Sequence, residues 1–178
     1  RAVAAWASVS LGRVQHYFTS KDRLLEAGFE RANERSSARI ADLLGGDPDG
    51  APAHDILVVV LTQLIPHDPF SWTHLRVRQS FIARGLTDEH IATRLRSDYL
   101  QLHRRLGHAV RRQQDNGAIR LDADPVALAK RLVAHAEGLA THVLLGATTP
   151  DQARAAVLAS LEEQAPPEAP ASSPSRER

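Results

Sequence analysis

The sequence of 178 residues contains no cysteine and no methionine, and aromatic residues make up only 4% of it. Without cysteine the chain has no disulfide, no thiol redox sensor and no thiolate metal site. No apolar run approaches the ~20 residues needed to span a bilayer and no secretory signal is present, so we expect a cytoplasmic protein without a membrane segment. Alanine and leucine dominate the apolar 43% of the chain, which favours helices over strands.

Motifs of catalysis and of metal binding are also missing. We find no glycine-rich phosphate loop, no nucleophile elbow and no His-Glu-x-x-His pattern, so an enzyme is not expected and no catalytic residue is assigned. The nine histidines are poorly spaced for a metal site, since His103 and His108, the closest pair, lie five positions apart instead of three or four. We therefore expect neither a metal nor another cofactor.

Apolar spacing near 3.6 residues, together with capping residues and breakers, predicts an all-α chain without strands or repeats. Ser20 ahead of residues 21–44 is typical of a capped long helix, and Thr149-Pro150 marks the start of the last one. The helices are expected near residues 1–7, 11–18, 21–44, 53–65, 70–84, 88–116, 124–145 and 150–164.

The first 25 residues hold the most specific pattern. They read as two short helices joined by a tight turn and followed by a long helix, which is the form of a helix-turn-helix unit. The residues that carry the pattern are Val3, Ala4, Ala7, Val9, Ser10, Gly12, Tyr17, Phe18, Ser20, Lys21, Asp22, Leu24 and Leu25. At this spacing the segment resembles the end of the DNA-reading domain of the TetR family of transcriptional regulators.

Ser8 and Trp6 depart from the family pattern, which usually has a turn glycine and a polar residue at these positions. In the family another helix precedes Val3 and packs under the reading helix. Because this chain lacks an initiator methionine and begins within a helix, we expect upstream residues that include that first helix.

The resemblance implies a division into three parts. Residues 1–45 would form the helix-turn-helix DNA-binding region, with its first helix missing, and run into the connecting helix. Residues 46–164 would form a helical ligand-binding and dimerisation domain. Residues 165–178, rich in proline, are expected to be a disordered tail.

The implied function is that of a ligand-responsive repressor, released from a palindromic DNA operator by a small-molecule effector. The partners would be double-stranded DNA, the effector and a second copy of the chain. Two alternatives stay open: an activator of the same fold, and a helical ligand-binding or interaction module that does not bind DNA.

In a helix-turn-helix unit the first turns of the second helix read the bases. Arg13 can bond guanine and Gln15 can bond adenine. The alternatives are that Arg13 is only a solvated charge and that Tyr17 is a core residue. Leu11 is placed to touch a thymine methyl group, and Gly12 lets the backbone approach DNA. The residues expected at phosphates are Ser10, His16, Tyr17 and Lys21.

The helices between residues 53 and 116 mix apolar bulk with a few polar tips, as a small-molecule pocket requires. The same residues could equally form a plain core. The predicted pocket residues are Leu61, Trp72, Leu75, Phe81, Tyr99, His103 and Leu106.

Two stripes on the last two helices indicate a dimer interface, in which two helices from each subunit form a four-helix arrangement. The stretch 124–161 also resembles the last two helices of one branch of the family. Burial of both stripes within their own subunit is the alternative. The predicted interface residues are Leu132, His135, Leu139, His142, Val143, Val157 and Leu161.

Overall fold

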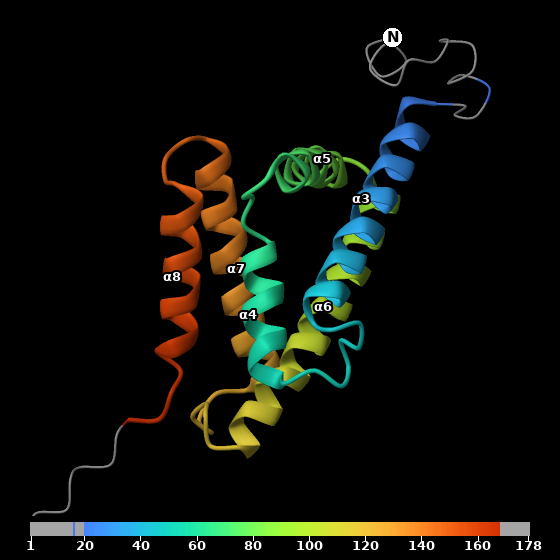
Figure 1. Ribbon diagram of the computed structural model, residues 1–178. Coiled ribbons are helices and arrows are strands. Elements are labelled where there is room, and N and C mark those ends of the chain that lie inside the picture. Colours follow the sequence, from blue (N-terminus) through green and yellow to red (C-terminus); the bar gives the residue numbers. More distant parts are fainter. Residues whose placement is uncertain (1–15, 17–19, 168–178) are drawn as a thin grey trace, which may run out of the picture.

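The computed structural model describes residue 16 and residues 20–167, which form a bundle of helices (Figure 1). The predicted all-α class is confirmed, since the described residues contain no strand and each helix end lies within two residues of its expected place. The expected helices near 1–7 and 11–18, and residues 168–178 of the expected tail, lie outside the described residues. The helices are α3 (Lys21–Leu43), α4 (Ala53–Gln63), α5 (Pro69–Gly85), α6 (Glu89–Asp115), α7 (Pro125–Leu144) and α8 (Pro150–Glu162).

Side-chain caps and glycines set where the helices begin and end. The Ser20 hydroxyl accepts a hydrogen bond of 3.1 Å from the backbone N–H of Arg23, which caps α3 as predicted. Thr149 caps α8 through a reciprocal capping box. Gly45 and Gly46, with φ of 79° and 85°, turn the chain out of α3 through a backbone conformation that other residues adopt only with strain.

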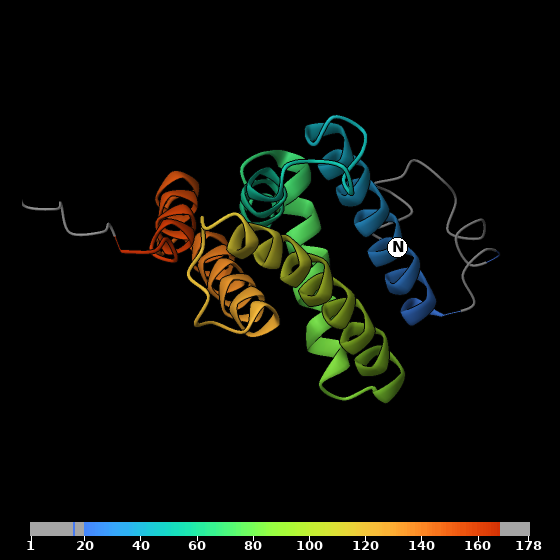
Figure 2. The same ribbon diagram turned by 90° about the horizontal axis from the view of Figure 1, so that it is seen from below.

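The helices form a row across the molecule. In the two views, α3 lies along one flank, α8 lies along the opposite flank, and α4, α5 and α6 lie between α3 and the α7–α8 pair (Figures 1 and 2). α6 packs most extensively against α7, and α3 packs chiefly against α5. The helix that begins directly after the expected DNA-reading region is thus remote from the last two helices.

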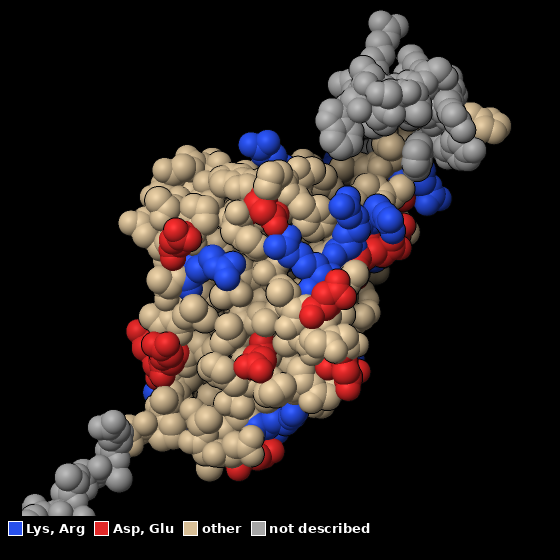
Figure 3. Space-filling view, in the orientation of Figure 1, with Lys and Arg blue, Asp and Glu red and all other residues tan. Residues whose placement is uncertain are grey.

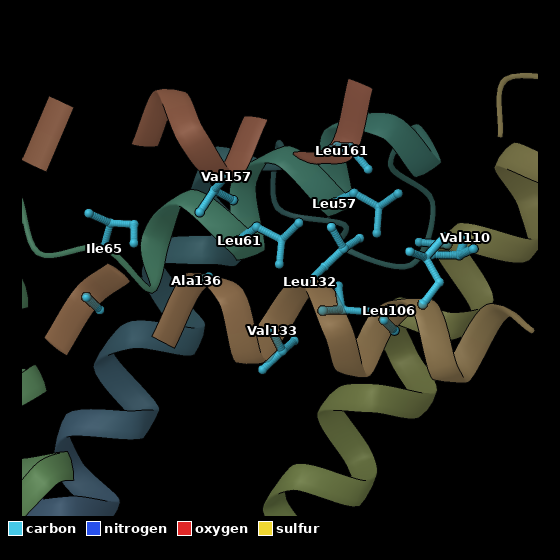
Figure 4. Packing of buried hydrophobic residues seen from close by; sticks show 14 of the residues in the cluster. Leu57, Leu61, Ile65, Leu106, Val110, Leu132, Val133, Ala136, Val157 and Leu161 are labelled. Carbon is cyan, nitrogen blue, oxygen red and sulfur yellow. The ribbon is translucent and has the colours of Figure 1, made fainter. Parts of the chain in front are cut away.

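The main hydrophobic core joins α4, α6, α7 and α8, whose side chains point toward one another in Figure 4. Leu57 and Leu61 of α4 are fully buried there, as is Val110 of α6. Burial of each such side chain contributes about 1.5–3 kcal/mol to folding. A second, smaller cluster holds α3 in place, because the rings of Phe29 and Phe81 stack with centroids 4.1 Å apart beside Ile91.

Helices α6 and α7 approach each other closely at Gly107. A Cβ atom built on this glycine would lie 2.9 Å from Cγ2 of Val126 and 3.3 Å from its Cα atom. The second neighbour is backbone, which cannot turn aside as a flexible side chain can. Gly107 therefore fixes the distance between the two helices that form the largest contact in the bundle.

We expect Gly107→Ala to lower the free energy of unfolding by about 1–3 kcal/mol, because the added methyl group overpacks this contact. Gly28→Ala is the matched control in α3, since no described atom beyond its own helix lies within 4 Å of a Cβ at that position. There the better helix propensity of alanine should raise stability by up to ~1 kcal/mol. Urea denaturation of both variants measures the difference, and an equal gain in both would refute the role of Gly107.

Candidate ligand-binding site

A cavity of about 730 Å³ lies between α3, α4, α5 and α6. This volume is in the range of cavities that hold small molecules. One part of its wall is polar and is formed by α5, α6 and the middle of α3. The remaining wall is largely apolar and includes Ile40, Leu44, Ile56, Val60, Leu64, Leu102 and Leu106.

A buried arginine joins three helices at the polar end. Arg78 of α5 donates hydrogen bonds to the Glu137 carboxylate of α7 and, at 3.1 Å, to the hydroxyl of Tyr99 in α6. The Tyr99 hydroxyl in turn donates to Oε2 of Glu137 at 2.9 Å. Burial lowers the pKa of Arg78, whereas Tyr99 and Asp98 act against this shift. The network compensates a guanidinium that would be costly to bury alone.

His74 lies one helical turn before Arg78 and faces α3. Its Nε2 atom lies 3.1 Å from Oδ1 of Asn33, and this pairing requires that Nε2 carry the proton. Burial, and after it the charge of Arg78, lower the pKa of His74 to about 4. The imidazole is therefore neutral at physiological pH, and it joins α3 to α5 without adding a charge to the cavity.

Asp98 of α6 brings a carboxylate to the same end. Its Oδ1 atom accepts a hydrogen bond of 3.4 Å from Nε of Arg94, which also donates to Glu30 of α3 at 3.0 Å. Its Oδ2 atom is buried and has no hydrogen-bond partner among the described residues. The Asp98 side chain as a whole is still 35% exposed, so solvent reaches the rest of it.

A second polar contact ties α3 to the start of α5. Arg39 donates to the carboxylate of Asp68, which also caps α5 by accepting from the backbone N–H of Ser71 at 2.7 Å. Arg39 further contacts Nε2 of His67 at 3.0 Å. Burial acts to raise the pKa of Asp68, but the bonds from Ser71 and Arg39 outweigh it and hold that pKa far below its ordinary value.

Three of the predicted pocket residues line the cavity: Leu75, Tyr99 and Leu106. The other four do not. Leu61 is fully buried in the main core, and Trp72 packs against that core. Phe81 stacks on Phe29, and the ring of His103 lies 5.7 Å from that of Tyr99, outside the lining.

The polar residues Asn33, His74, Arg78 and Asp98 are the part of the site that the sequence reasoning missed. A signal was present, since His74 and Arg78 are four positions apart and share the face of α5 that carries the buried Leu75. Charged or polar residues on an otherwise buried helix face point to a site or to a buried ion pair.

The profile of the family described as "BetI-type transcriptional repressor, C-terminal" matches residues 53–166, which is more than half of the chain. This match covers the five helices from α4 to α8. The chain belongs to the TetR family of transcriptional regulators. The resemblance noted at residues 3–25 is thereby confirmed at the level of the family.

Similar proteins agree with this membership. The chain is 25% identical over 145 residues to the HTH-type transcriptional regulator PksA of Bacillus subtilis. The aligned segment covers 82% of this chain and 68% of PksA. A putative TetR-family regulator from Rhodococcus sp. superposes with a TM-score of 0.78 at 25% identity, covering 91% of this chain and 85% of that one. A putative regulator from Saccharomonospora viridis, in complex with choline, has the same fold, with a TM-score of 0.70 at 24% identity and coverage of 90% and 82%.

Most residues predicted to contact DNA in this TetR-family chain lie outside the described residues: Ser10, Leu11, Gly12, Arg13, Gln15 and Tyr17. His16 is described and is exposed, and Lys21 is the first residue of α3. On the face shown in Figure 3, basic side chains are most numerous near the beginning of α3, where acidic side chains are mixed with them. No helix among the described residues is both long enough and apolar enough to cross a bilayer.

The residues predicted for the dimer interface fall into two groups. Leu132, Val143, Val157 and Leu161 are at most 6% exposed in the single chain, because they face the main core between α4, α7 and α8. They have almost no surface left to offer a partner. His135 and His142 are exposed and Leu139 is half-buried. His135 also lies 2.9 Å from the hydroxyl of Ser160, so it bridges α7 and α8.

We expect Asp68→Asn to lower the free energy of unfolding at pH 7 by about 1 kcal/mol, since the amide keeps the cap but loses the partly exposed ion pair with Arg39. A carboxyl with a depressed pKa stabilises the fold above the pKa of the unfolded chain, about 4, and this contribution is lost as the pH falls below that value. The difference in stability between wild type and variant should therefore begin to narrow at about pH 4 and keep narrowing as the pH falls toward the much lower folded-state pKa of Asp68.

Chemical denaturation at three pH values measures this gap. Asp124→Asn is the matched control, because Asp124 is an exposed cap that accepts from Ala127 N–H at 2.7 Å. A gap of the same size for Asp68→Asn at acidic and neutral pH would refute the contribution of the Asp68 charge.

Proposed function

We propose that this chain is a ligand-responsive repressor that acts in the cytoplasm as a homodimer on a palindromic operator. Residues 1–45 would supply the DNA-binding region and residues 46–164 the effector-binding and dimerisation domain. A small molecule in the cavity would favour an arrangement of α3 in which the two reading helices no longer match the spacing of the major groove. The change is a shift between two populations, driven by the difference in effector affinity between them.

The main support for this proposal is the position of α3 between the N-terminal segment and the cavity. The helix begins at Lys21, directly after the segment that resembles a helix-turn-helix, and it supplies Asn33 and Ile40 to the cavity wall. A ligand in the cavity therefore contacts the same rigid helix that leads to the DNA-reading residues. The match to a repressor family and the choline complex of the Saccharomonospora viridis protein support a repressor with a small-molecule effector.

A DNA-binding experiment separates this function from a module that does not bind DNA. The protein, with its natural upstream residues, should select a palindrome from a random duplex library. Arg13→Ala should then relax the base preference and cost about 1–3 kcal/mol on the preferred site. Lys21→Ala should weaken binding to all sequences alike and reduce the salt slope by about 1.

Fluorescence anisotropy at several salt concentrations measures both effects. Equal changes in the two variants would refute the division between base reading and phosphate contact. If the wild-type protein shows no preference across the library, the regulator function itself is refuted.

The dimer would form through the outer faces of α7 and α8. These helices lie on the flank opposite α3. The exposed residues there include Gly138 of α7, Leu145 directly after α7, which is 76% exposed, and Ala155 and Ala159 of α8. Small residues let helices approach closely across a two-fold axis. This exposed surface would form the interface in place of Leu132, Val143, Val157 and Leu161, which are buried within their own subunit.

Gly138→Glu should convert the dimer to a monomer without unfolding it, because no described atom beyond its own helix lies within 4 Å of a Cβ at that position in the single chain. Gly28→Glu, on an exposed glycine of α3, is the matched control and should stay dimeric. Sedimentation velocity measures the mass and circular dichroism checks the fold. A Gly138→Glu protein that remains dimeric would place the interface elsewhere.

A further inference from the structure

We propose that the cavity binds an uncharged ligand, with an oxygen atom that accepts a hydrogen bond from Arg78 and an apolar body that lies against α3, α4 and α6. The inference rests on the proposed function, in which this cavity is the effector site, and it names the chemical class of that effector.

Arg78 has N–H donors that the described residues leave unused. Its Nη2 atom makes both of its hydrogen bonds, to Glu137 and to the Tyr99 hydroxyl, whereas Nη1 and Nε have no partner among the described residues. Arg78 lines the cavity and Glu137 does not. The ion pair therefore engages one edge of the guanidinium and leaves the donors of the other edge for a bound molecule.

A molecule in the cavity can reach these donors. The Arg78 side chain is 16% exposed. In the part of the chain that the structure describes, the fully buried side-chain atoms without a partner are Oδ2 of Asp98 and Oε1 of Gln114, and neither Nη1 nor Nε is among them. A purely apolar molecule would displace water from these N–H groups and leave them without an acceptor, which is unfavourable. The ligand is therefore expected to supply an oxygen acceptor here.

The charges that line the cavity are balanced, which favours a ligand without a charge of its own. The lining has three carboxylates and three guanidiniums, which belong to Glu30, Glu34, Asp98, Arg78, Arg94 and Arg105. Glu34 and Arg105 are exposed, so solvent and salt screen their opposite charges.

The less exposed charges already have partners. Arg94 binds both Glu30 and Asp98, and the charge of Arg78 is compensated by Glu137. A carboxylate or an ammonium group would lose its hydration in the cavity without gaining a free counter-ion. A carbonyl oxygen, in contrast, can accept from Arg78 and leave these ion pairs intact.

The apolar wall receives the body of the ligand. Ile40 of α3, Ile56 and Val60 of α4, and Leu102 and Leu106 of α6 line the same cavity as Arg78. Burial of apolar surface against these side chains would supply most of the affinity, while the hydrogen bond from Arg78 would fix the orientation.

Four probes built on a phenyl ring and a three-carbon chain test the inference by isothermal titration calorimetry at pH 7: propiophenone, propylbenzene, 3-phenylpropanoate and 3-phenylpropylammonium. Propiophenone is uncharged and has a carbonyl acceptor. It should bind at least about tenfold more tightly than either charged probe.

A paired substitution isolates the hydrogen bond from Arg78. Arg78→Met together with Glu137→Gln removes the donors and both charges of the ion pair, so the balance of charge is kept. The ratio of propiophenone to propylbenzene affinity should fall at least about tenfold, and the ratio cancels the difference in hydrophobicity between the two probes. Arg76→Met, at an exposed position of α5 outside the lining, is the matched control and should leave the ratio unchanged.

Glu137→Gln alone tests the balance of charge. It leaves the Arg78 guanidinium without its counter-ion, so the affinity for 3-phenylpropanoate should rise at least about tenfold. The affinity for propiophenone should change by less than about threefold, because the carbonyl acceptor carries no charge.

Equal or tighter binding of a charged probe by the wild-type protein, or no binding of propiophenone, overturns the inference, whether or not the variants fold. An unchanged affinity ratio in the folded paired variant also overturns it, as does an unchanged affinity of the Glu137→Gln protein for 3-phenylpropanoate.

The proposed function is tested separately by adding propiophenone to the DNA complex. If propiophenone binds as expected but leaves DNA affinity unchanged, the ligand class stands and the effector function fails. If a charged molecule occupies the cavity and releases the DNA, the function stands and the ligand class fails.

Discussion

The buried guanidinium of Arg78 constrains the wall of the cavity, because a charge removed from water is tolerated only where its hydrogen bonds are met. Glu137 and Tyr99 meet them, and this requires α5, α6 and α7 to keep one relative position. The ion pair of Arg78 and Glu137 also lies in a polar patch at the edge of an apolar core. An interior that were apolar throughout would pack as well, but it would have no fixed point at which a ligand could be oriented. On the proposed function, ligand recognition would depend on an ion pair whose net contribution to stability is small.

Local signals were sufficient to predict the helices from the sequence. Ser20 and Thr149 cap helices where they were expected to, and Gly45 and Gly46 end α3, because caps and breakers act within a few residues. The site was less accessible, since it depends on how helices rotate about their axes after packing. Leu61 and Leu75 have the same spacing signal in the sequence, but only Leu75 faces the cavity. The same limit applies to the stripe of Leu132 and Val143, which periodicity alone cannot assign to a core or to an interface.

The two hydrophobic clusters hold different parts of the bundle together by different kinds of packing. The main core binds α4, α6, α7 and α8 through many aliphatic side chains, and the close contact at Gly107 fixes two of these helices further. α3 is held instead by one stacked ring pair and a few polar contacts. Aliphatic cores resist displacement because each side chain fills a specific space. The helix that leads toward the expected DNA-binding region is held by a smaller cluster than the one that joins α4, α6, α7 and α8.

The bond between Arg39 and Asp68 has a geometric consequence for that helix. It holds α3 near its C-terminal end, eighteen residues or about 27 Å from Lys21. The contacts of Phe29, Glu30 and Asn33 hold the helix along that length. A rotation of only about 5° around Arg39 would carry the start of α3 by about 2 Å, while the carboxylate that caps α5 stays in place. On the proposed function, a ligand that shifted the contacts of Phe29, Glu30 and Asn33 would need to turn α3 by only a few degrees to displace its first residue, because the helix is long.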